Sequence, residues 1–403
     1  MSQTPASPVP DSTASSTSAA APSRPAGFRW KLGLVHLIVG LAIVALWWFW
    51  LAPDRTLQVF VGLYILASAA AFAMLIWWTF FSGLSWRARL IGHGALLLAL
   101  ATFVALFRHE GFAGDMMPLF AWRFSPSHEE RAAAFWKVQD ARTMDANDTV
   151  ANEPGQRLEI SDGDWPRFRG PLGDGIVRDA SIRTDWDANP PQLVWKHPVG
   201  LGWSSFAVVG PYAYTQEQRD NLEAVVCYDA ATGNQVWIHT DETRLDTSLG
   251  GSGPRSTPTI HDSKVYAVGA TGLLNCLDAV TGKTLWATDV LADAGAKGKW
   301  VEWGLSGSPL ILEDMVIVNT GLDGEKNAAG TLAAYDRHTG RRLWLSGSNK
   351  ASYTSPTLMT IAGTPQIVIV DADEVAAYEP ATGCATDAGR SPAHRPRLRR
   401  HRR

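Results

Sequence analysis

The sequence predicts two dissimilar parts, a group of three transmembrane helices followed by an all-β domain built from repeated four-stranded sheets. Three apolar runs of about 20 residues each lie within residues 28–107. From residue 192 onward, one motif recurs at intervals of about 50 residues. With 403 residues, 46% of them hydrophobic and 19% charged, the chain is long enough for both parts.

Charge and cysteine content argue against two classes of protein. The formal net charge of -3 leaves no overall basic surface of the kind that nucleic acids bind, so we expect no nucleic-acid partner. The three cysteines, Cys227, Cys276 and Cys384, are too few for a disulfide framework and lack the spacing of a zinc site. No metal site is predicted from these residues.

The N-terminal quarter has the pattern of a membrane anchor. Residues 1–27 consist mainly of Ser, Thr, Ala, Pro and Gln, and this composition predicts a disordered segment. Residues 28–107 contain the predicted spans 32–51, 57–81 and 90–107, each long enough for a bilayer. Tryptophans cluster at the ends of these runs, as is typical of the membrane interface. The alternative, three buried helices of a soluble protein, explains the pattern less well.

The basic residues indicate how this anchor is oriented. Arg24, Arg29 and Lys31 precede the first span, and Arg87 and Arg89 separate the second from the third. The positive-inside rule then places the N-terminus in the cytoplasm. Three crossings would deliver the rest of the chain to the far side, which in a bacterium with two membranes is the periplasm. We therefore expect a protein of the bacterial inner membrane with a periplasmic domain.

Residues 108–163 are interpreted as a connector. Ser127 is followed three residues later by Glu130, and this capping-box spacing predicts a short helix over 127–144. Residues 145–163 are polar and rich in Asp and Asn, which is typical of a linker.

The repeated motif consists of a strand that ends in an acidic residue, a Thr-Gly turn and a second strand with a tryptophan. The glycine tolerates the turn conformation, and the acidic side chain can accept hydrogen bonds from turn amides. Three copies are complete, and a fourth starts with Glu379 and Gly383 but has Asp387 where a tryptophan is expected. The complete copies comprise Asp229, Gly233 and Trp237; Asp278, Gly282 and Trp286; and Asp336, Gly340 and Trp344.

Each copy, with a further pair of strands upstream, has the length of one four-stranded propeller blade. The sequence therefore predicts a partial β-propeller of about 3.5 blades. In this interpretation the motif tryptophans pack between neighbouring blades, and the motif acids cap turns rather than catalyse.

The pattern Ala-x-Asp-x-x-Thr-Gly-x-x-x-Trp resembles the tryptophan-docking motif of pyrroloquinoline-quinone (PQQ) propellers. The segments Asp164-Trp-Pro-Arg-Phe-Arg-Gly-Pro171 and Gly253-Pro-Arg-Ser-Thr-Pro258 are similar to those of bacterial PQQ-binding-like repeat proteins. The resemblance covers residues 164–383 and implies a quinoprotein-type fold. It implies two different functions: quinoprotein dehydrogenases bind PQQ and calcium, whereas a propeller subunit of the outer-membrane assembly machinery binds proteins.

The repeat breaks off at the C-terminal end. Residues 384–403 are rich in arginine and show no strand pattern, so we expect an unstructured basic tail. A frameshift is favoured over a tail that binds membrane or nucleic acid, because the change falls within a motif. The strand Gln192–Val199 has the pattern of the last strand of a closing blade, whose other strands the sequence lacks. The resemblance therefore implies a propeller that is truncated at its C-terminus.

Polar and aromatic residues between the blade strands are the candidate ligand-binding residues, because packing of the repeat does not require them. If they converge on one face, the arginines and the lysine can bind an anionic ligand such as a tricarboxylate cofactor, and an indole can stack on it. The alternative is that they are solvated loop residues. The candidates are Trp203, Glu217, Arg219, Arg244, Arg255, Trp303, Lys350 and Tyr353.

These observations favour a membrane-anchored periplasmic propeller that binds a ligand or a protein of the envelope. The alternative is a membrane quinoprotein alcohol or sugar dehydrogenase, for which the resemblance implies PQQ and calcium. The residues identify no catalytic group, and they leave open whether a cofactor is bound.

Overall fold

The computed structural model describes residues 30–46, 57–112, 117–146, 157–178, 181–247, 250–295, 302–320, 330–350, 352–372 and 374–386. The chain divides into two compact units, Met1–Phe124 and Ser125–Arg403, which are considered separately. The expectations for residues 1–27, for the linker residues 147–156 and for most of the basic tail, 387–403, lie outside the described residues.

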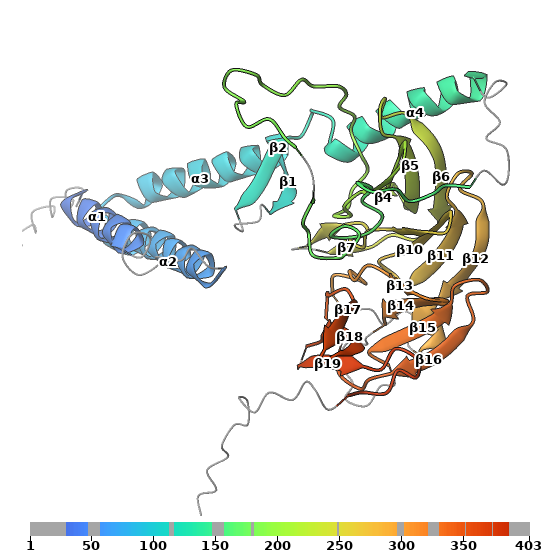
Figure 1. The fold of residues 1–403 in the computed structure, drawn as a ribbon. Helices are drawn as coiled ribbons and strands as arrows, with labels where there is room; N and C mark the ends of the chain where they lie inside the picture. The colour runs from blue at the N-terminus through green and yellow to red at the C-terminus, as the bar shows by residue number, and fades with distance from the viewer. Residues whose placement is uncertain are drawn as a thin grey trace, which may run out of the picture. The chain divides into compact units, whose positions relative to one another are not determined.

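The first unit is helical, with a short hairpin at its end (Figure 1). Ser85 caps the third helix by accepting a hydrogen bond from the amide of Ala88. The elements are α1 (Trp30–Leu46), α2 (Leu57–Ile76), η2 (Trp77–Phe81), α3 (Trp86–Leu106), β1 (Phe107–Phe112) and β2 (Pro118–Trp122).

Two stretches of this unit have the length and hydropathy of a membrane span, Val61–Phe81 and Trp86–Leu106. They correspond to the predicted spans 57–81 and 90–107. The first predicted span, 32–51, is represented by the shorter apolar stretch Gly33–Leu46, and its last residues lie outside the described part. The structure therefore supports two of the three predicted spans by length and composition.

The second unit begins with α4 (His128–Ala146), which starts at a capping box. The amide of Ser127 donates to Glu130 Oε2 at 2.6 Å, and the amide of Glu130 donates to Ser127 Oγ at 2.9 Å. These two bonds satisfy amides that the first turn of a helix leaves without partners.

Antiparallel sheets follow in chain order, and we name four of them blades 1 to 4 (Figure 1). Blade 1 contains β3 (Ala207–Val209), β4 (Tyr212–Arg219), β5 (Leu222–Asp229) and β6 (Gln235–Asp241). Blade 2 contains β9 (Thr259–His261), β10 (Lys264–Val268), β11 (Leu273–Asp278) and β12 (Thr284–Asp289). Blade 3 contains β13 (Leu310–Leu312), β14 (Met315–Asn319), β15 (Leu332–Asp336) and β16 (Arg342–Ser346). Blade 4 contains β17 (Thr357–Ile361), β18 (Thr364–Val370) and β19 (Val375–Tyr378).

Two smaller elements lie between the blades. A two-stranded sheet, β7 (Asp246–Thr247) and β8 (Gly251–Ser252), follows blade 1, and the short helix α5 (Val290–Asp293) follows blade 2. Three four-stranded sheets and one three-stranded sheet agree with the predicted repeat of strands. The described residues do not form a closed ring of blades, because their buried clusters join each blade to the next and none joins blade 4 to blade 1.

The motif acids cap their turns in the same way in each complete copy. Asp278 Oδ1 accepts hydrogen bonds from the amides of Val280 and Thr281 and from the Thr281 hydroxyl, at 2.8–3.1 Å. Asp229 and Asp336 make the equivalent three bonds. Because all these contacts lie within the turn, the motif acids position the second strand of each pair.

Each motif tryptophan docks on the turn of the following blade. Trp237 Nε1 donates to the carbonyl of Ala279 at 3.0 Å, and Trp286 Nε1 donates to that of Arg337 at 3.0 Å. The rings lie directly over the turn glycines: a Cβ added to Gly282 would be 2.5 Å from Trp237 Cδ2. Trp344 covers Gly383 in the same manner.

A row of hydroxyl groups links the segments just before the first strands of successive blades. The amide of Ser205 donates to Thr257 Oγ1 at 3.2 Å, and the amide of Thr257 donates to Ser308 Oγ at 2.9 Å. The amide of Ser308 continues the row by donating to Ser355 Oγ at 2.8 Å. These bonds fix the spacing of the blades along the edge where β3, β9, β13 and β17 begin.

The segment predicted as the last strand of a closing blade has no regular strand in the structure. Its tryptophan nevertheless occupies the docking position on blade 1. Trp195 Nε1 donates to the carbonyl of Ala230 at 3.0 Å, and its ring lies over Gly233. Docking of the indole therefore does not require that this segment pair in a sheet.

Candidate functional site

A cavity of about 810 Å³ opens beside the first strands of blades 3 and 4. Its walls come from the loop 167–174, from Arg255 in the segment before β9, from the segments before β13 and β17, and from strands β17 and β18. The loop is held in place because Trp165 pairs with Val208 of β3, and because the amide of Ile260 in β9 donates to the carbonyl of Pro166 at 2.7 Å.

Three arginines line this cavity, namely Arg167, Arg169 and Arg255. None of them has a carboxylate within ion-pair distance among the described residues. Asp174, which also lines the cavity, is paired with Arg178 at 2.5 Å. Desolvation by burial lowers the pKa of Arg167 and is the main cause that lowers the pKa of Arg255. An anion in the cavity would relieve this unfavourable burial of positive charge.

Backbone carbonyls hold the arginine side chains. Arg167 Nη2 donates to the carbonyl of Pro171 at 2.9 Å, and Arg169 Nη2 donates to that of Asp174 at 3.1 Å. Arg255 Nε donates to the carbonyl of Trp303 at 2.9 Å. A guanidinium has five N–H donors, so each arginine keeps donors that these bonds do not use.

Two of the eight predicted ligand-binding residues, Arg255 and Tyr353, line this cavity, and two more, Trp203 and Trp303, contact them from outside its lining. Arg255 Cζ lies 5.9 Å from the ring centroid of Trp203, and Trp203 Nε1 and Arg255 Nη2 both donate to the carbonyl of Gly250. Trp303 and Tyr353 are stacked, with ring centroids 5.0 Å apart. The structure thus joins an arginine and three aromatic side chains from separate loops.

Three other predicted residues lie elsewhere: Arg244 and Arg219 contact α4, and Glu217 contacts Arg219. Arg244 Nη1 is 2.7 Å from Glu129 Oε1, and Arg219 lies over the ring of Trp136, with Cζ 4.6 Å from the centroid. Glu217 binds Arg219 at 2.6 Å. These charges are neutralised within the chain and are separate from the cavity residues.

Lys350 is not among the residues that line the cavity. Its backbone carbonyl accepts a hydrogen bond from the amide of Ala372 at 3.2 Å. Sequence reasoning also missed two residues, Arg167 and Arg169, which it used only as part of a family-like segment. The only feature of the sequence that could have singled out these two arginines is their position on either side of Phe168. This pattern does not indicate that the loop lies beside strand β17.

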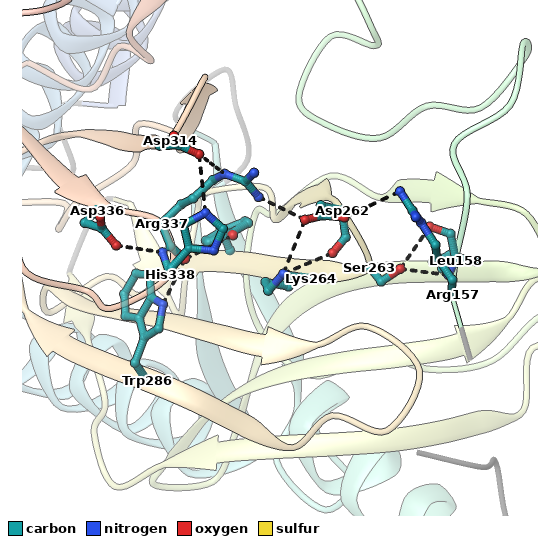
Figure 2. A network of polar contacts seen from close by, with 11 residues as sticks. Arg157, Leu158, Asp262, Ser263, Lys264, Trp286, Asp314, Asp336, Arg337 and His338 are labelled. Carbon is teal, nitrogen blue, oxygen red and sulfur yellow. Dashed lines mark hydrogen bonds and ion pairs between the residues drawn. The ribbon is translucent and has the colours of Figure 1, made fainter. Parts of the chain in front are cut away.

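A second group of charges lies at the turns of blades 2 and 3, where the side chains are paired with one another (Figure 2). Arg337 Nη1 is 3.1 Å from Asp262 Oδ2, and its Nε is 3.3 Å from Asp314 Oδ1. The bond from Arg337 is the largest cause of the lowered pKa of Asp262. This group connects two blades and is therefore less suited to a ligand than the cavity is.

The cavity residues fit one part of the cofactor that the family resemblance implies. The three arginines and the aromatic ring of Tyr353 suit a planar anion such as a tricarboxylate. Calcium requires several oxygen ligands, usually including carboxylates. The described residues contain no group of three or more His, Cys, Asp or Glu that could hold a metal ion. The fit therefore extends to the organic anion and not to its metal.

Repeated antiparallel blades joined by docked tryptophans define a PQQ-repeat protein. A family model described as outer membrane protein assembly factor BamB matches residues 187–397, which is more than half of the chain. The chain therefore belongs to this family of PQQ-repeat proteins.

Its relatives fall into two functional groups. The dehydrogenase subunit of a quinone alcohol dehydrogenase from Gluconacetobacter polyoxogenes is 30% identical over 128 residues, which are 31% of this chain and 17% of that protein. Outer membrane protein assembly factor BamB from Shewanella oneidensis is 29% identical over 222 residues, covering 48% of this chain and 50% of that protein. Among solved structures, the quinohemoprotein alcohol dehydrogenase of Comamonas testosteroni has 19% identity and a TM-score of 0.41, over 64% of this chain and 44% of that one. The chain thus spans about half or less of the length of these relatives.

Proposed function

We propose that this chain is a membrane-anchored binding module whose arginine-lined cavity takes a planar, anionic organic ligand. The observation that carries the proposal is the joint presence of Arg167, Arg169 and Arg255 in one cavity, each without a carboxylate partner among the described residues. Charge-assisted hydrogen bonds from guanidinium groups are the strong interactions by which proteins hold carboxylates and phosphates. Tyr353, which lines the same cavity, supplies an aromatic surface for a flat ligand.

We also propose that the chain is anchored in the bacterial inner membrane and that its second unit lies in the periplasm. It is supported by the two apolar stretches long enough to span a bilayer, and by Arg87 and Arg89 at the start of the third helix. It can be tested in intact cells by labelling single cysteines with a membrane-impermeant maleimide. Ser125→Cys is expected to react from the periplasm and Arg87→Cys only after lysis, in a chain whose three native cysteines are replaced by serine. The reverse pattern would contradict the proposed orientation.

The binding proposal can be tested with the full chain in detergent micelles and PQQ, a planar tricarboxylate, as the probe. Quenching of tryptophan fluorescence gives the dissociation constant, and we expect Arg255→Gln and Arg169→Gln each to weaken binding by about tenfold. Arg342→Gln is the matched control, because Arg342 is paired with Asp293 outside the cavity. Equal affinities for all variants, or no saturable quenching by PQQ, would contradict the proposal.

The similarity to quinone alcohol dehydrogenases favours a second candidate function, a PQQ-dependent dehydrogenase. A dehydrogenase would be distinguished from a binding module by activity: the purified chain, with PQQ, calcium and an alcohol or sugar, would reduce an artificial electron acceptor. The similarity to BamB favours a third, protein-binding role in the envelope. That role is distinguished by specific co-purification of an envelope protein that survives the Arg255→Gln substitution, since a protein contact elsewhere on the blades does not depend on the cavity.

A further inference from the structure

The hairpin of β1 and β2 follows the third helix of the first unit directly. Helix α3 ends at Leu106 and β1 begins at Phe107, so the hairpin starts where the apolar stretch Trp86–Leu106 ends. Figure 1 shows the hairpin at this end of α3. If α3 spans a bilayer, as proposed above, the hairpin lies next to the membrane surface, because no linker separates it from the helix.

The return strand of the hairpin closes the C-terminal end of α3. The amide of Arg123 donates to the carbonyl of Leu106 at 2.8 Å, and Arg123 Nη2 donates to that of Val104 at 2.7 Å. The last carbonyls of a helix have no partners within the helix, and lipid offers none. The other arginine of the hairpin, Arg108, forms an ion pair with Glu110 at 2.9 Å. Both cationic side chains are therefore bound within the unit.

Aromatic side chains cover one face of the hairpin. Phe107 lies opposite Trp122, with ring centroids 5.5 Å apart, and their side chains share this face. His109 lies opposite Phe120 at 5.7 Å, and alternation along the strands places this pair on the same face. The ring of Phe103, in the last turn of α3, is 5.1 Å from that of Phe120. These five residues form one continuous surface on hairpin and helix, which we call the aromatic face.

The aromatic face is exposed, and the opposite face of the hairpin is different in character. Phe120 is 50% exposed and Trp122 is 46% exposed. On the opposite face Arg108 pairs with Ala121, and Leu119 near the tip is the apolar exception. Exposed aromatic rings on one side and charged groups on the other are typical of segments that lie in a membrane interface, where the rings contact lipid and the charges stay in water.

The start of the return strand also contacts the other apolar stretch of this unit. The hydroxyl of Tyr64 donates to Met117 Sδ at 3.8 Å. Tyr64 lies in the first turn of the stretch Val61–Phe81, and only residues 82–85 connect this stretch to Trp86–Leu106. If both stretches cross the bilayer, so short a connection makes them run in opposite directions. The start of one and the end of the other then lie at the same membrane surface, and the hairpin contacts both.

We propose that the aromatic face is a lipid-binding surface, by which the hairpin lies in the interfacial layer of the bilayer. The hydrocarbon core is excluded, because the edges of a two-stranded sheet carry backbone groups that need water. Zwitterionic lipid is sufficient for this contact, since Arg108 and Arg123 already have partners within the unit. The hairpin then fixes the depth of α3 in the membrane. This proposal rests on the proposed membrane anchor and is independent of the cavity.

The proposal can be tested with the full chain in phosphatidylcholine vesicles by measuring the depth of fluorescent labels. A nitrobenzoxadiazole label is placed on Phe120→Cys or, as the matched control on the opposite face, on the adjacent Ala121→Cys. Cys384→Ser removes the exposed native thiol from these chains, and the buried Cys227 and Cys276 are left in place. Lipids that carry a nitroxide near the headgroup or near the chain end quench each label according to its depth.

We expect the label at position 120 to lie about 10 Å deeper than the label at position 121, since the side-chain layers on the two faces of a sheet are about that far apart. Leu98→Cys, at an exposed position in the middle of α3, reports separately on the anchor and should give the deepest label. Quenching at position 98 with none at position 120 would overturn the lipid contact of the hairpin alone. No quenching at position 98 would overturn the anchor and, with it, this proposal.

A second variant keeps all rings of the aromatic face in place. Met117→Cys changes an exposed residue before β2, and its label should also be quenched by the nitroxide near the headgroup. No quenching of this label in a chain that is quenched at position 98 would overturn the proposal even if Phe120→Cys distorts the hairpin. Replacing part of the phosphatidylcholine by phosphatidylglycerol should leave all depths unchanged, and a contact that requires the anionic lipid would overturn the role of the aromatic face.

Discussion

Trp237, in the last strand of blade 1, donates a hydrogen bond from its indole Nε1 to the carbonyl of Ala279, in the last turn of blade 2, at 3.0 Å. Trp195 and Trp286 make the same bond to the next turn in the row. Each contact joins residues that lie 35 to 51 positions apart in the chain. The junction of blades 1 and 2 and that of blades 2 and 3 therefore each contain this polar contact as well as an apolar cluster, whereas Trp344 Nε1, at the junction of blades 3 and 4, is buried without a hydrogen-bond partner among the described residues.

Replacing Trp237 should destabilise the junction between blades 1 and 2. The side chain is 8% exposed, and its removal leaves a cavity in the cluster shared by these blades. We expect Trp237→Ala to lower the free energy of unfolding by about 3 kcal/mol. Trp237→Phe keeps much of the packing and should cost less. Urea unfolding followed by circular dichroism measures both variants, and equal losses for Ala and Phe would show that ring packing is not the main contribution.

Gly282 should tolerate no side chain, because the ring of Trp237 covers it. Its φ of 71° is unfavourable for other residues, and a Cβ there would be 2.5 Å from Trp237 Cδ2. Gly363 offers a matched control, since its φ is 80° but a Cβ there would meet nothing within 4 Å. We expect Gly282→Ala to lower the melting temperature more than Gly363→Ala, which reports the backbone strain alone. Similar melting temperatures for the two variants would show that the indole can move away.

Glu223 should make the stability of the chain depend on pH. Desolvation by burial raises the pKa of its carboxyl to about 7, against a lowering effect of the hydrogen bond from Ala270 and a further raising effect of Asp241. Between the unfolded pKa of 4.5 and about 7, the folded state holds a proton that the unfolded state has lost. Stability from this group is therefore complete below the unfolded pKa, decreases as the pH rises through this interval, and levels off above it.

The loss amounts to the order of 2 kcal/mol between pH 5 and pH 8. Glu223→Gln cannot ionise and should remove most of this decrease, whereas Glu242→Gln, at an exposed loop position, should retain it. Urea unfolding at a series of pH values measures the effect. A decrease of equal size in the Glu223→Gln variant would assign the pH dependence to another group.

Arg337 and Asp262 should contribute a small, salt-dependent coupling between blades 2 and 3 (Figure 2). Asp262 is 38% exposed at its side chain, so water and salt screen the pair. A double-mutant cycle with Arg337→Met and Asp262→Asn should give a coupling energy of about 0.5 kcal/mol at low salt, decreasing at 1 M salt. The exposed neighbour Arg341 provides the control, since Arg341→Met should show no coupling with Asp262→Asn.

The capping of the turns by the motif acids and the docking of the motif tryptophans could be predicted from the sequence, because the same residues recur in each complete copy. Asp278, Gly282 and Trp286 act through their own turn or through the adjacent blade, and a repeat reveals such roles by repetition. The candidate site was predicted only in part. Arg255 and Tyr353 were found because they interrupt the repeat, but Arg167 lies in a segment before the first blade, where no repeat offers a comparison.

The sequence by itself determined the local structure of this protein: apolar helices near the N-terminus, and strands and turns that recur at intervals of about 50 residues after residue 200. These features follow from hydropathy and from conformational preferences that act over a few residues. Only the tertiary structure decided which charges share a location. Arg219 and Arg244 neutralise charge and support a helix on blade 1, whereas Arg255 lines a cavity with two arginines of a distant loop. The physical reason is that burial and ion pairing depend on neighbours brought together across about 100 residues of chain, and no local pattern records those distances.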